Sequence, residues 1–205
     1  MAQRHTLGAM FGGALMVGLA SVRLAAQVPA RVVRAVDDAQ VVRLAGNTPP
    51  QLRAGADQGA APADLPFQHI LLVLRRSPAQ AADLRQLLDA QRENDSPNFH
   101  QWLTPAQFGA RFGPAPADLA AVTAWLARQG FQIDSVSPGE GVIEFSGTAG
   151  AVASGLHVEI HRYLVAGVAH WANAADPAIP AALAPVVAGI VSLNDFRKPP
   201  ASHFA

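Results

Sequence analysis

The segment from Ile70 to Glu93 limits the possible folds most strongly, because a strand signal runs directly into a helix signal. Ile70–Leu74 is an unbroken apolar run followed by two arginines, which indicates a central strand. Ser77 then provides a helix N-cap, with Pro78 at the first helical position and Gln80 three residues after the cap. Leucines at helical spacing continue toward the end of the segment. We therefore expect a strand covered by an amphipathic helix.

The same helix-start signal recurs in the middle of the chain, and a strand pair follows it. Thr104 precedes a proline and stands three residues before a glutamine, which predicts a second helix. A third helix carries an apolar stripe over Leu119–Leu126 and is expected to end at Gly130 in a left-handed cap. Residues 131–136 and 142–145 are rich in apolar strand formers and flank a glycine-containing turn, so they predict a β-hairpin.

The rest of the folded region alternates helix and strand patterns. A short alanine-rich helix is expected over Ala149–Gly155, and the alternation of apolar and polar residues over 156–161 predicts a half-buried strand. Val168–Trp171 is expected to pair with that strand, and the apolar stretch Ile179–Leu193 predicts a final helix. Without the extra helices, this order is the split βαβ plan. The sequence therefore predicts a ferredoxin-like α+β fold, with an antiparallel sheet and inserted helices.

The N-terminal part of the chain differs from the middle in composition. Residues 1–26 combine a short basic start, an uncharged apolar run and a small-residue cleavage site, which together indicate a secretory signal peptide. We therefore expect a secreted or periplasmic protein with no stable membrane anchor after signal cleavage. Residues 27–66 alternate short apolar pairs with Arg, Asp, Gly and Pro, and predict a flexible N-terminal arm containing one short strand.

Charge and cysteine content argue against several functional classes. Lys plus Arg and Asp plus Glu both number 15, so the formal net charge is zero and nothing in it indicates a nucleic-acid partner. The chain has no cysteine, which excludes disulfides and thiol catalysis. Only 15% of the residues are charged, a share that is low against the usual quarter or so. A weakly charged surface is consistent with a domain that rests against a partner.

Several stretches between residues 67 and 197 resemble one known family when they are taken together and in order. They are Phe99–Gly113, Ile143–Ala149, Ile160–Tyr163, His170–Asn173 and Asp176–Asp195. The series is similar to the activation domains, or propeptides, of sedolisin- and kumamolisin-type serine-carboxyl peptidases. Phe99–Gly113 is the most distinctive stretch, and the resemblance covers nearly all of 67–197.

The resemblance implies a domain that performs no chemistry. In this family the propeptide is exported together with a subtilisin-like catalytic domain, assists its folding, inhibits it near neutral pH and is released in acid. The implied partner is therefore a serine-carboxyl peptidase catalytic domain. By the same resemblance, 67–197 form the activation domain, 198–205 begin the linker and the catalytic domain is absent, so we expect no enzymatic activity. A secreted binding or inhibitory module that acts in trans on another protein is the alternative.

The stretch Ser146–Thr148 invites a catalytic interpretation, because serine-carboxyl peptidases carry their nucleophile in a Ser-Gly-Thr-Ser motif. Here Ala149 replaces the second serine. A nucleophile also needs a base within hydrogen-bond reach and an oxyanion hole. We instead expect a turn in which Thr148 caps the following helix, and no catalytic residue.

The histidines are the remaining candidates for function. His157 and His161 are four residues apart, but the local period is two, so they are expected on the polar face of a strand about 13 Å apart. No companion ligands accompany them, and we expect no metal and no cofactor. Histidine changes charge between about pH 5 and 8. The candidates for a partner interface or a pH sensor are therefore His100, His157, Glu159, His161 and His170.

Four aromatic residues lie in or just before the second predicted helix: Phe99, Trp102, Phe108 and Phe112. Phe108 and Phe112 are four apart and share a helix face. We expect all four to take part in core and helix packing rather than in a ligand-stacking platform.

Overall fold

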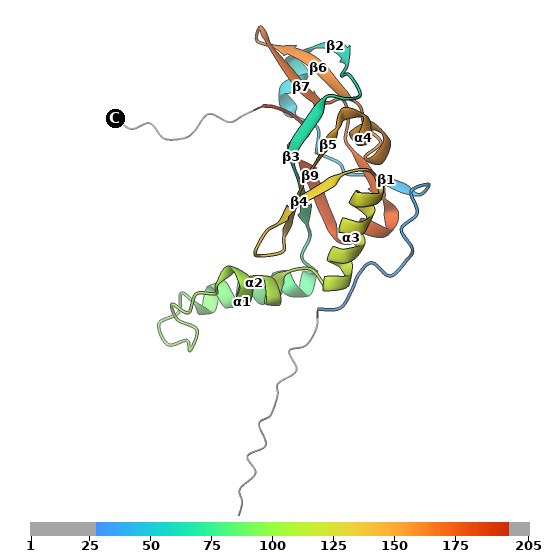
Figure 1. Ribbon diagram of the computed structural model, residues 1–205. Helices are drawn as coiled ribbons and strands as arrows, with labels where there is room; N and C mark the ends of the chain where they lie inside the picture. Colours follow the sequence, from blue (N-terminus) through green and yellow to red (C-terminus); the bar gives the residue numbers. More distant parts are fainter. Residues whose placement is uncertain (1–27, 197–205) are drawn as a thin grey trace, which may run out of the picture.

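The computed structural model describes residues 28–196, and its centre is a four-stranded sheet (Figure 1). The expected signal peptide at 1–26 and the expected linker at 198–205 lie outside the described residues. The strand order is β4-β5-β3-β9, and every neighbouring pair is antiparallel. The strands are β3 (Pro66–Leu74), β4 (Gln132–Val136), β5 (Val142–Thr148) and β9 (Val187–Val191).

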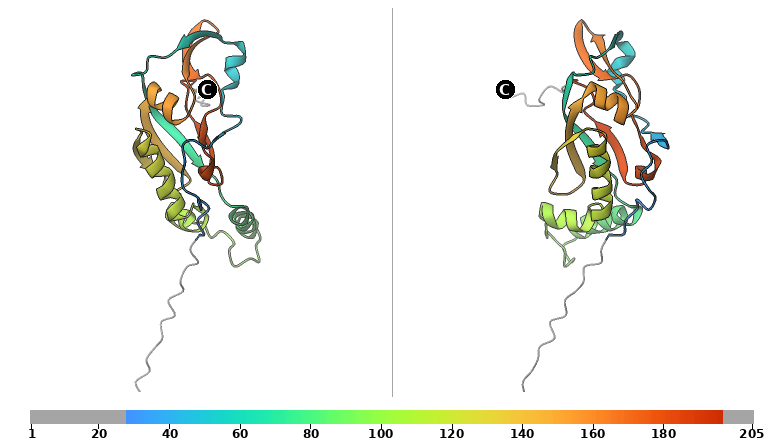
Figure 2. Two further views of the ribbon diagram at one scale, coloured as in Figure 1. Left: turned by 90° about the vertical axis from the view of Figure 1, so that its right-hand side faces the viewer. Right: turned by 45° about the vertical axis from the view of Figure 1, so that its right-hand side comes forward.

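Two helices complete a ferredoxin-like unit. The helix α3 (Pro116–Arg128) precedes β4, and α4 (Ala149–Gly155) follows β5. The first and third strands of this unit, β3 and β5, lie in the middle of the sheet, as in the split βαβ plan. In the left view of Figure 2, α3 and α4 lie on the same side of the sheet. The structure thus confirms the predicted α+β fold class.

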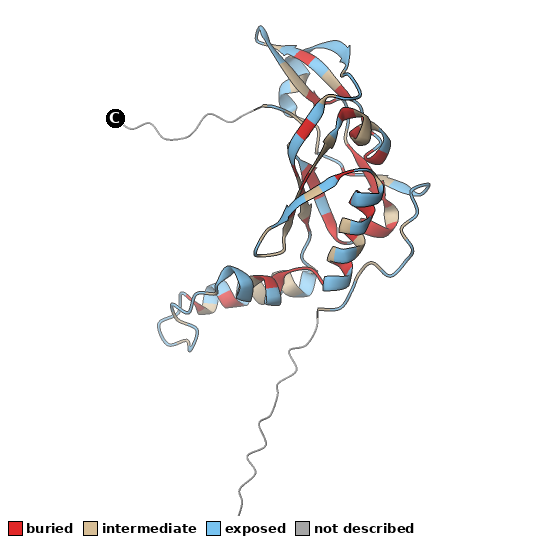
Figure 3. Ribbon diagram, viewed as in Figure 1, coloured by how far each residue is buried: buried red, intermediate tan, exposed pale blue. Residues whose placement is uncertain are grey.

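The core fills the space between the sheet and these two helices. Figure 3 shows buried residues concentrated where α3 and α4 meet the strands. Phe131 and Phe145 meet edge to face with their ring centroids 5.0 Å apart. The largest fully buried side chains include Trp125, Leu126, Ile70, Leu72, Ile143, Phe145 and Ile190.

The other two long helices form a helical arm, residues 77–113, that projects from one end of the sheet (Figure 1). α1 (Pro78–Ala90) and α2 (Pro105–Phe112) both begin at the predicted N-caps, and both show complete capping boxes. At Ser77 the hydroxyl accepts from the backbone N–H of Gln80, whose side chain in turn accepts from the Ser77 N–H. Such local hydrogen bonds explain why these helix starts could be predicted.

A smaller three-stranded sheet adjoins the central one, in the order β2-β6-β7. Its strands are β2 (Ala56–Ala60), β6 (Ile160–Val165) and β7 (Val168–Asn173), so the predicted pairing of the last two is confirmed. The strand predicted over 156–161 begins only at Ile160. Leu156 still caps α4, and His157 adopts a left-handed backbone conformation with a φ of 52°, which interrupts the extended chain.

The predicted final helix over Ile179–Leu193 is wrong. The segment holds the short strand β8 (Ala178–Pro180), a 3-10 turn η2 (Ala181–Leu183) and the edge strand β9. Prolines limit helix formation at Pro180 and Pro185, and β-branched residues dominate Val186–Val191. Pairing with β3 buries Ile190, which an isolated apolar pattern could not reveal.

The N-terminal segment also differs from its prediction. Residues 28–66 contain β1 (Val41–Arg43), a 3-10 turn η1 (Pro50–Ala54) and β2, and β1 pairs with β8. The buried carboxylate of Asp118 accepts the backbone N–H groups of Arg31 and Val32 at 2.8 to 3.0 Å. The N-terminal segment therefore contains two short strands instead of one, and it packs against the domain through partners far away in sequence.

Candidate functional site

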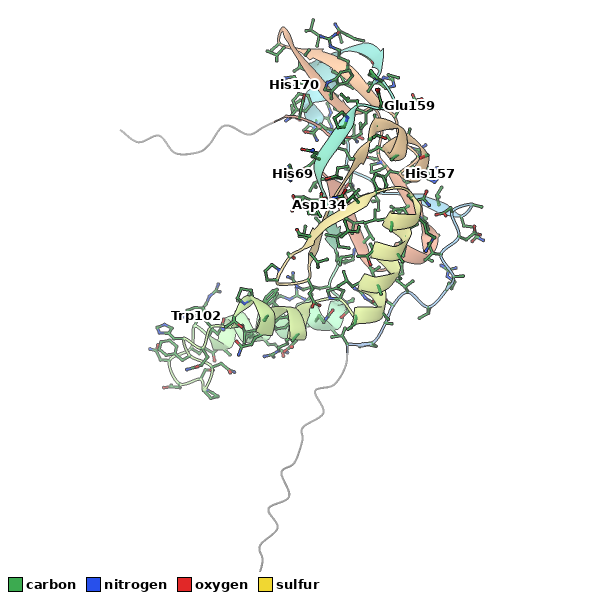
Figure 4. The ribbon with its side chains drawn as sticks, viewed as in Figure 1. His69, Trp102, Asp134, His157, Glu159 and His170 are labelled. Atoms are coloured by element: carbon green, nitrogen blue, oxygen red, sulfur yellow. The ribbon has the colours of Figure 1, made fainter. Side chains whose placement is uncertain are left out.

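The five candidate residues from the sequence do not form one site. Figure 4 shows His157 and Glu159 near the end of α4 and His170 in the smaller sheet. His100 lies in the loop between α1 and α2, at the far end of the helical arm, and has a φ of 54°. The structure brings together only Glu159 and His161.

His161 ties the N-terminal segment to the smaller sheet. Its ring nitrogens contact Asp57 at 2.8 Å and Glu159 at 3.2 Å. Burial lowers the pKa of His161, but the hydrogen bonds to the two carboxylates outweigh this effect, so the pKa lies above its ordinary value. The backbone N–H of Gly59, and then His161, hold the pKa of Asp57 below its ordinary value. The pair is strongest when both groups are charged.

His170 holds the last described residues against β7. Its Nδ1 lies 2.9 Å from the Asp195 carboxylate, and its ring is 4.4 Å from the ring of Phe196. The backbone N–H of Asp195 also donates to the carbonyl of Trp171 at 3.1 Å. His157, in contrast, is exposed and makes no side-chain hydrogen bond to any residue of 28–196 that the structure describes.

A larger candidate surface is the open face of the central sheet, which is the face turned away from α3 and α4. In β3 and β5, alternate residues face the core, so Leu71 and Val73 must point outward together with their cross-strand neighbours Glu144 and Val142. On the other edge of β3, Val191 of β9 pairs with Leu71, and it is 46% exposed. The open face is thus half apolar, with a carboxylate at its centre.

A polar cluster surrounds that carboxylate. Glu144 contacts the ring of His69 through one oxygen and accepts the hydroxyl of Ser135 at 3.0 Å through the other. The hydrogen bond with His69, followed by that from Ser135, holds the pKa of Glu144 below its ordinary value. Next to them, the hydroxyl of Ser146 donates to Asp134. Figure 4 labels His69 and Asp134 on neighbouring parts of the sheet.

Sequence patterns did not reveal this cluster. The register of β3 shifts between Phe67 and Ile70, and His69 sits in that irregularity with a φ of 58°. The shift turns His69 toward Glu144, which is 75 residues away in the sequence. The sequence offers only two polar residues, Gln68 and His69, directly before the apolar run of β3, and this pattern does not predict a β-bulge.

Ser146 shows no arrangement for nucleophilic catalysis. It lies inside β5, and its hydrogen bond goes to a carboxylate rather than to a histidine. Thr148 caps α4 by accepting the N–H of Ala151 at 3.2 Å, as predicted. Within 28–196, no three His, Asp or Glu side chains are placed to share a metal ion. The helices in this range are all too short or too polar to cross a membrane.

The aromatic residues of the arm divide into two groups. Phe112 is buried, and it contacts Phe108 with ring centroids 5.2 Å apart, so the expected helix packing is found there. Trp102 was expected to pack in the same way, but it is 71% exposed. It lies in the loop before α2, where no other element between residues 28 and 196 covers it.

Comparison with known proteins agrees with the fold. A family model described as "Pro-kumamolisin, activation domain" matches residues 54–196, which is more than half of the chain. Xanthomonalisin from Xanthomonas sp. (strain T-22) is 34% identical over 141 residues, which cover 69% of this chain and 17% of that protein. Sedolisin from Pseudomonas sp. (strain 101) is 32% identical over 130 residues, which cover 63% of this chain and 22% of that protein. The chain thus spans less than a quarter of either relative, and it belongs to the pro-kumamolisin activation domain family.

Proposed function

We propose that this chain is the propeptide of a secreted serine-carboxyl peptidase and acts as a folding assistant and acid-released inhibitor of the catalytic domain. Its family membership supports the propeptide role, because the matched region is an activation domain. One surface can serve both activities. By binding the folded catalytic domain it stabilises that fold, and while bound it blocks the enzyme.

The open face of the central sheet is the observation that carries this proposal. One face of the sheet is covered by α3 and α4, whereas the other carries the half-buried Leu71, Val73 and Val142 and the exposed Val191 in adjacent positions. Contiguous exposed apolar surface on a small domain marks an interaction site. Docking on the catalytic domain would bury these side chains, with Glu144 in the middle of the contact.

The cluster around Glu144 supports release in acid. Near neutral pH, Glu144 is ionised and offers a negative charge to a cationic group or helix N-terminus of the partner. Protonation of His69, next to it, cancels that charge and repels the partner's positive charge. If the complex disfavours protonated His69, binding weakens on acidification.

His161 is a poor candidate for this release. Its folded-state pKa is raised, so protonation strengthens its contacts with Asp57 and Glu159 instead of breaking them. Acidification to about pH 5 therefore stabilises the pairing of β2 with β6. For that reason we assign the release to groups on the open face.

Inhibition of a mature serine-carboxyl peptidase such as sedolisin tests the proposal. The purified chain should inhibit at pH 7 and lose inhibition by pH 4, and Val191→Asp should weaken inhibition at least about tenfold, since a charge is buried without a partner. Val168→Asp is the matched control, because Val168 is also exposed but lies in the smaller sheet. Equal inhibition by both variants would exclude the open face as the docking surface. If the wild-type chain does not inhibit at all, the proposed inhibitor function is wrong.

The same assay tests the acid sensor. His69→Gln should move the release midpoint to lower pH, because glutamine keeps a polar contact with Glu144 but does not titrate. His157→Gln is the control, since His157 lies near α4 and away from the open face (Figure 4). A midpoint that moves with the His157 change and not with the His69 change would contradict the assignment.

A further inference from the structure

The far end of the helical arm carries an aromatic tip, defined here as Phe99, His100 and Trp102. The rings of Phe99 and His100 stack with centroids 3.8 Å apart, and His100 and Trp102 follow at 6.1 Å in nearly parallel planes. Trp102 is 71% exposed, and among the described residues it is the one aromatic side chain in the set of exposed large hydrophobic residues. The half-buried Phe99 and the exposed His100 and Trp102 thus form one stack of rings (Figure 4 labels Trp102).

The tip is held in a defined conformation by a buried polar residue. Gln91, at the end of α1, is only 4% exposed, and its side-chain nitrogen donates to the carbonyl of Gln101. The backbone N–H of His100 donates to the carbonyl of Gln91 at 3.3 Å. His100 adopts a left-handed conformation that a non-glycine residue rarely takes without outside support. A preformed tip binds a partner at a lower entropic cost than a mobile loop does.

Packing within the domain does not account for the tip. None of its three residues belongs to the hydrophobic core cluster. The arm touches the central sheet at its base, where Gly109 packs so closely on Pro138 that an added Cβ would lie 3.0 Å from its carbonyl oxygen. The tip lies at the opposite end of the arm, away from this contact, and Trp102 is left exposed there.

The arm lies beside the open face of the central sheet. In the left view of Figure 2, α3 and α4 lie on one side of the central sheet and α1 lies toward the other. At the inner corner, Val73 and Val142 of the open face line a small cavity together with Phe112 of the arm and Pro114, which directly follows the arm. Phe112 and Pro114 are buried at this corner, so the base of the arm packs directly against the edge of the open face.

We propose that the aromatic tip is a second docking point on the peptidase catalytic domain, where Trp102 enters an apolar pocket beyond the area covered by the open face. The inference rests on the proposed propeptide function and names a further part of the same interface. Tryptophan is one of the residues enriched among the side chains that contribute most to binding at protein–protein interfaces. The tip would thus set how firmly the propeptide is held, while the open face carries the acid response.

Binding to mature sedolisin at pH 7, measured by calorimetry, tests this inference. Trp102→Ala should weaken binding about 30-fold, which is the scale of an interface anchor. Val168→Ala is the control, because Val168 is 57% exposed in the smaller sheet at the other end of the molecule. It should change affinity less than about threefold. Trp102→Arg is a second variant, because the arginine stem can cover the stacked rings but its charge cannot enter an apolar pocket.

The outcomes separate the inference from the function on which it rests. If the wild type binds and both Trp102 variants bind equally well, the tip is not a docking point, but the propeptide function stands. If the wild type does not bind at all, the function itself fails. If the wild-type chain self-associates in sedimentation and Trp102→Ala abolishes this without changing peptidase affinity, the tip contacts a second copy and the inference is overturned.

Discussion

Replacing Asn47 by alanine should strongly destabilise the domain, although Asn47 lies before the region that the family model matches. Its side-chain nitrogen donates to the carbonyl of Leu44 at 2.7 Å, and its side-chain oxygen accepts the backbone N–H of Ile190 at 2.8 Å. Ile190 is 1% exposed and belongs to β9. Asn47 therefore connects the N-terminal segment to an edge strand of the central sheet.

The magnitude follows from these two hydrogen bonds. Alanine leaves the N–H of Ile190 and the carbonyl of Leu44 without this partner, and each unpaired buried group costs about 1–3 kcal/mol. We expect a loss of about 3 kcal/mol in the free energy of unfolding. For a domain of this size, 1 kcal/mol corresponds to about 2–4 °C, so the melting temperature should fall by about 10 °C.

Urea and thermal unfolding of the mature chain, followed by circular dichroism, measure this loss. Asn98→Ala is the matched control, because Asn98 is an exposed asparagine in the loop of the helical arm. Its replacement should change stability by less than about 0.5 kcal/mol. A loss below about 1 kcal/mol for Asn47→Ala would refute the view that residues 28–54 form part of the folded domain.

Three further predictions concern other parts of the molecule. Asp57→Asn should lower the pKa of His161, measured by NMR titration, and should destabilise the protein more at pH 5 than at pH 9, because the ion pair is lost as the pH rises through the raised pKa of His161. A greater loss of stability at pH 9 would show that the two side chains do not form this ion pair. Gly147→Val should cost about 2 kcal/mol in thermal unfolding, since an added Cβ would lie 2.6 Å from the ring of Phe131; unchanged stability would show that the ring moves freely. The chain should hydrolyse no peptide between pH 3 and 8, and activity that disappears in Ser146→Ala would overturn that expectation.

The elements that could be predicted from sequence depend on short-range hydrogen bonds. Ser77 and Thr104 begin α1 and α2 through contacts that reach only three residues along the chain. Gly130, with a φ of 83°, ends α3 for an equally local reason. The order of the elements indicated the ferredoxin-like plan. The strand expected to complete it, over 156–161, instead contributes to the smaller sheet, and β9 takes its place.

Only the tertiary structure decided which surfaces these elements present. The segment over Ile179–Leu193 is apolar enough for a helix or for strands, and pairing with β3 selects β9. His69 reaches Glu144 through a register shift, and Trp102 is exposed because none of the described elements covers the end of the helical arm. Local propensity acts over three or four residues, whereas the interface candidates result from contacts between residues as far apart as 75 positions, which only the folded chain brings together.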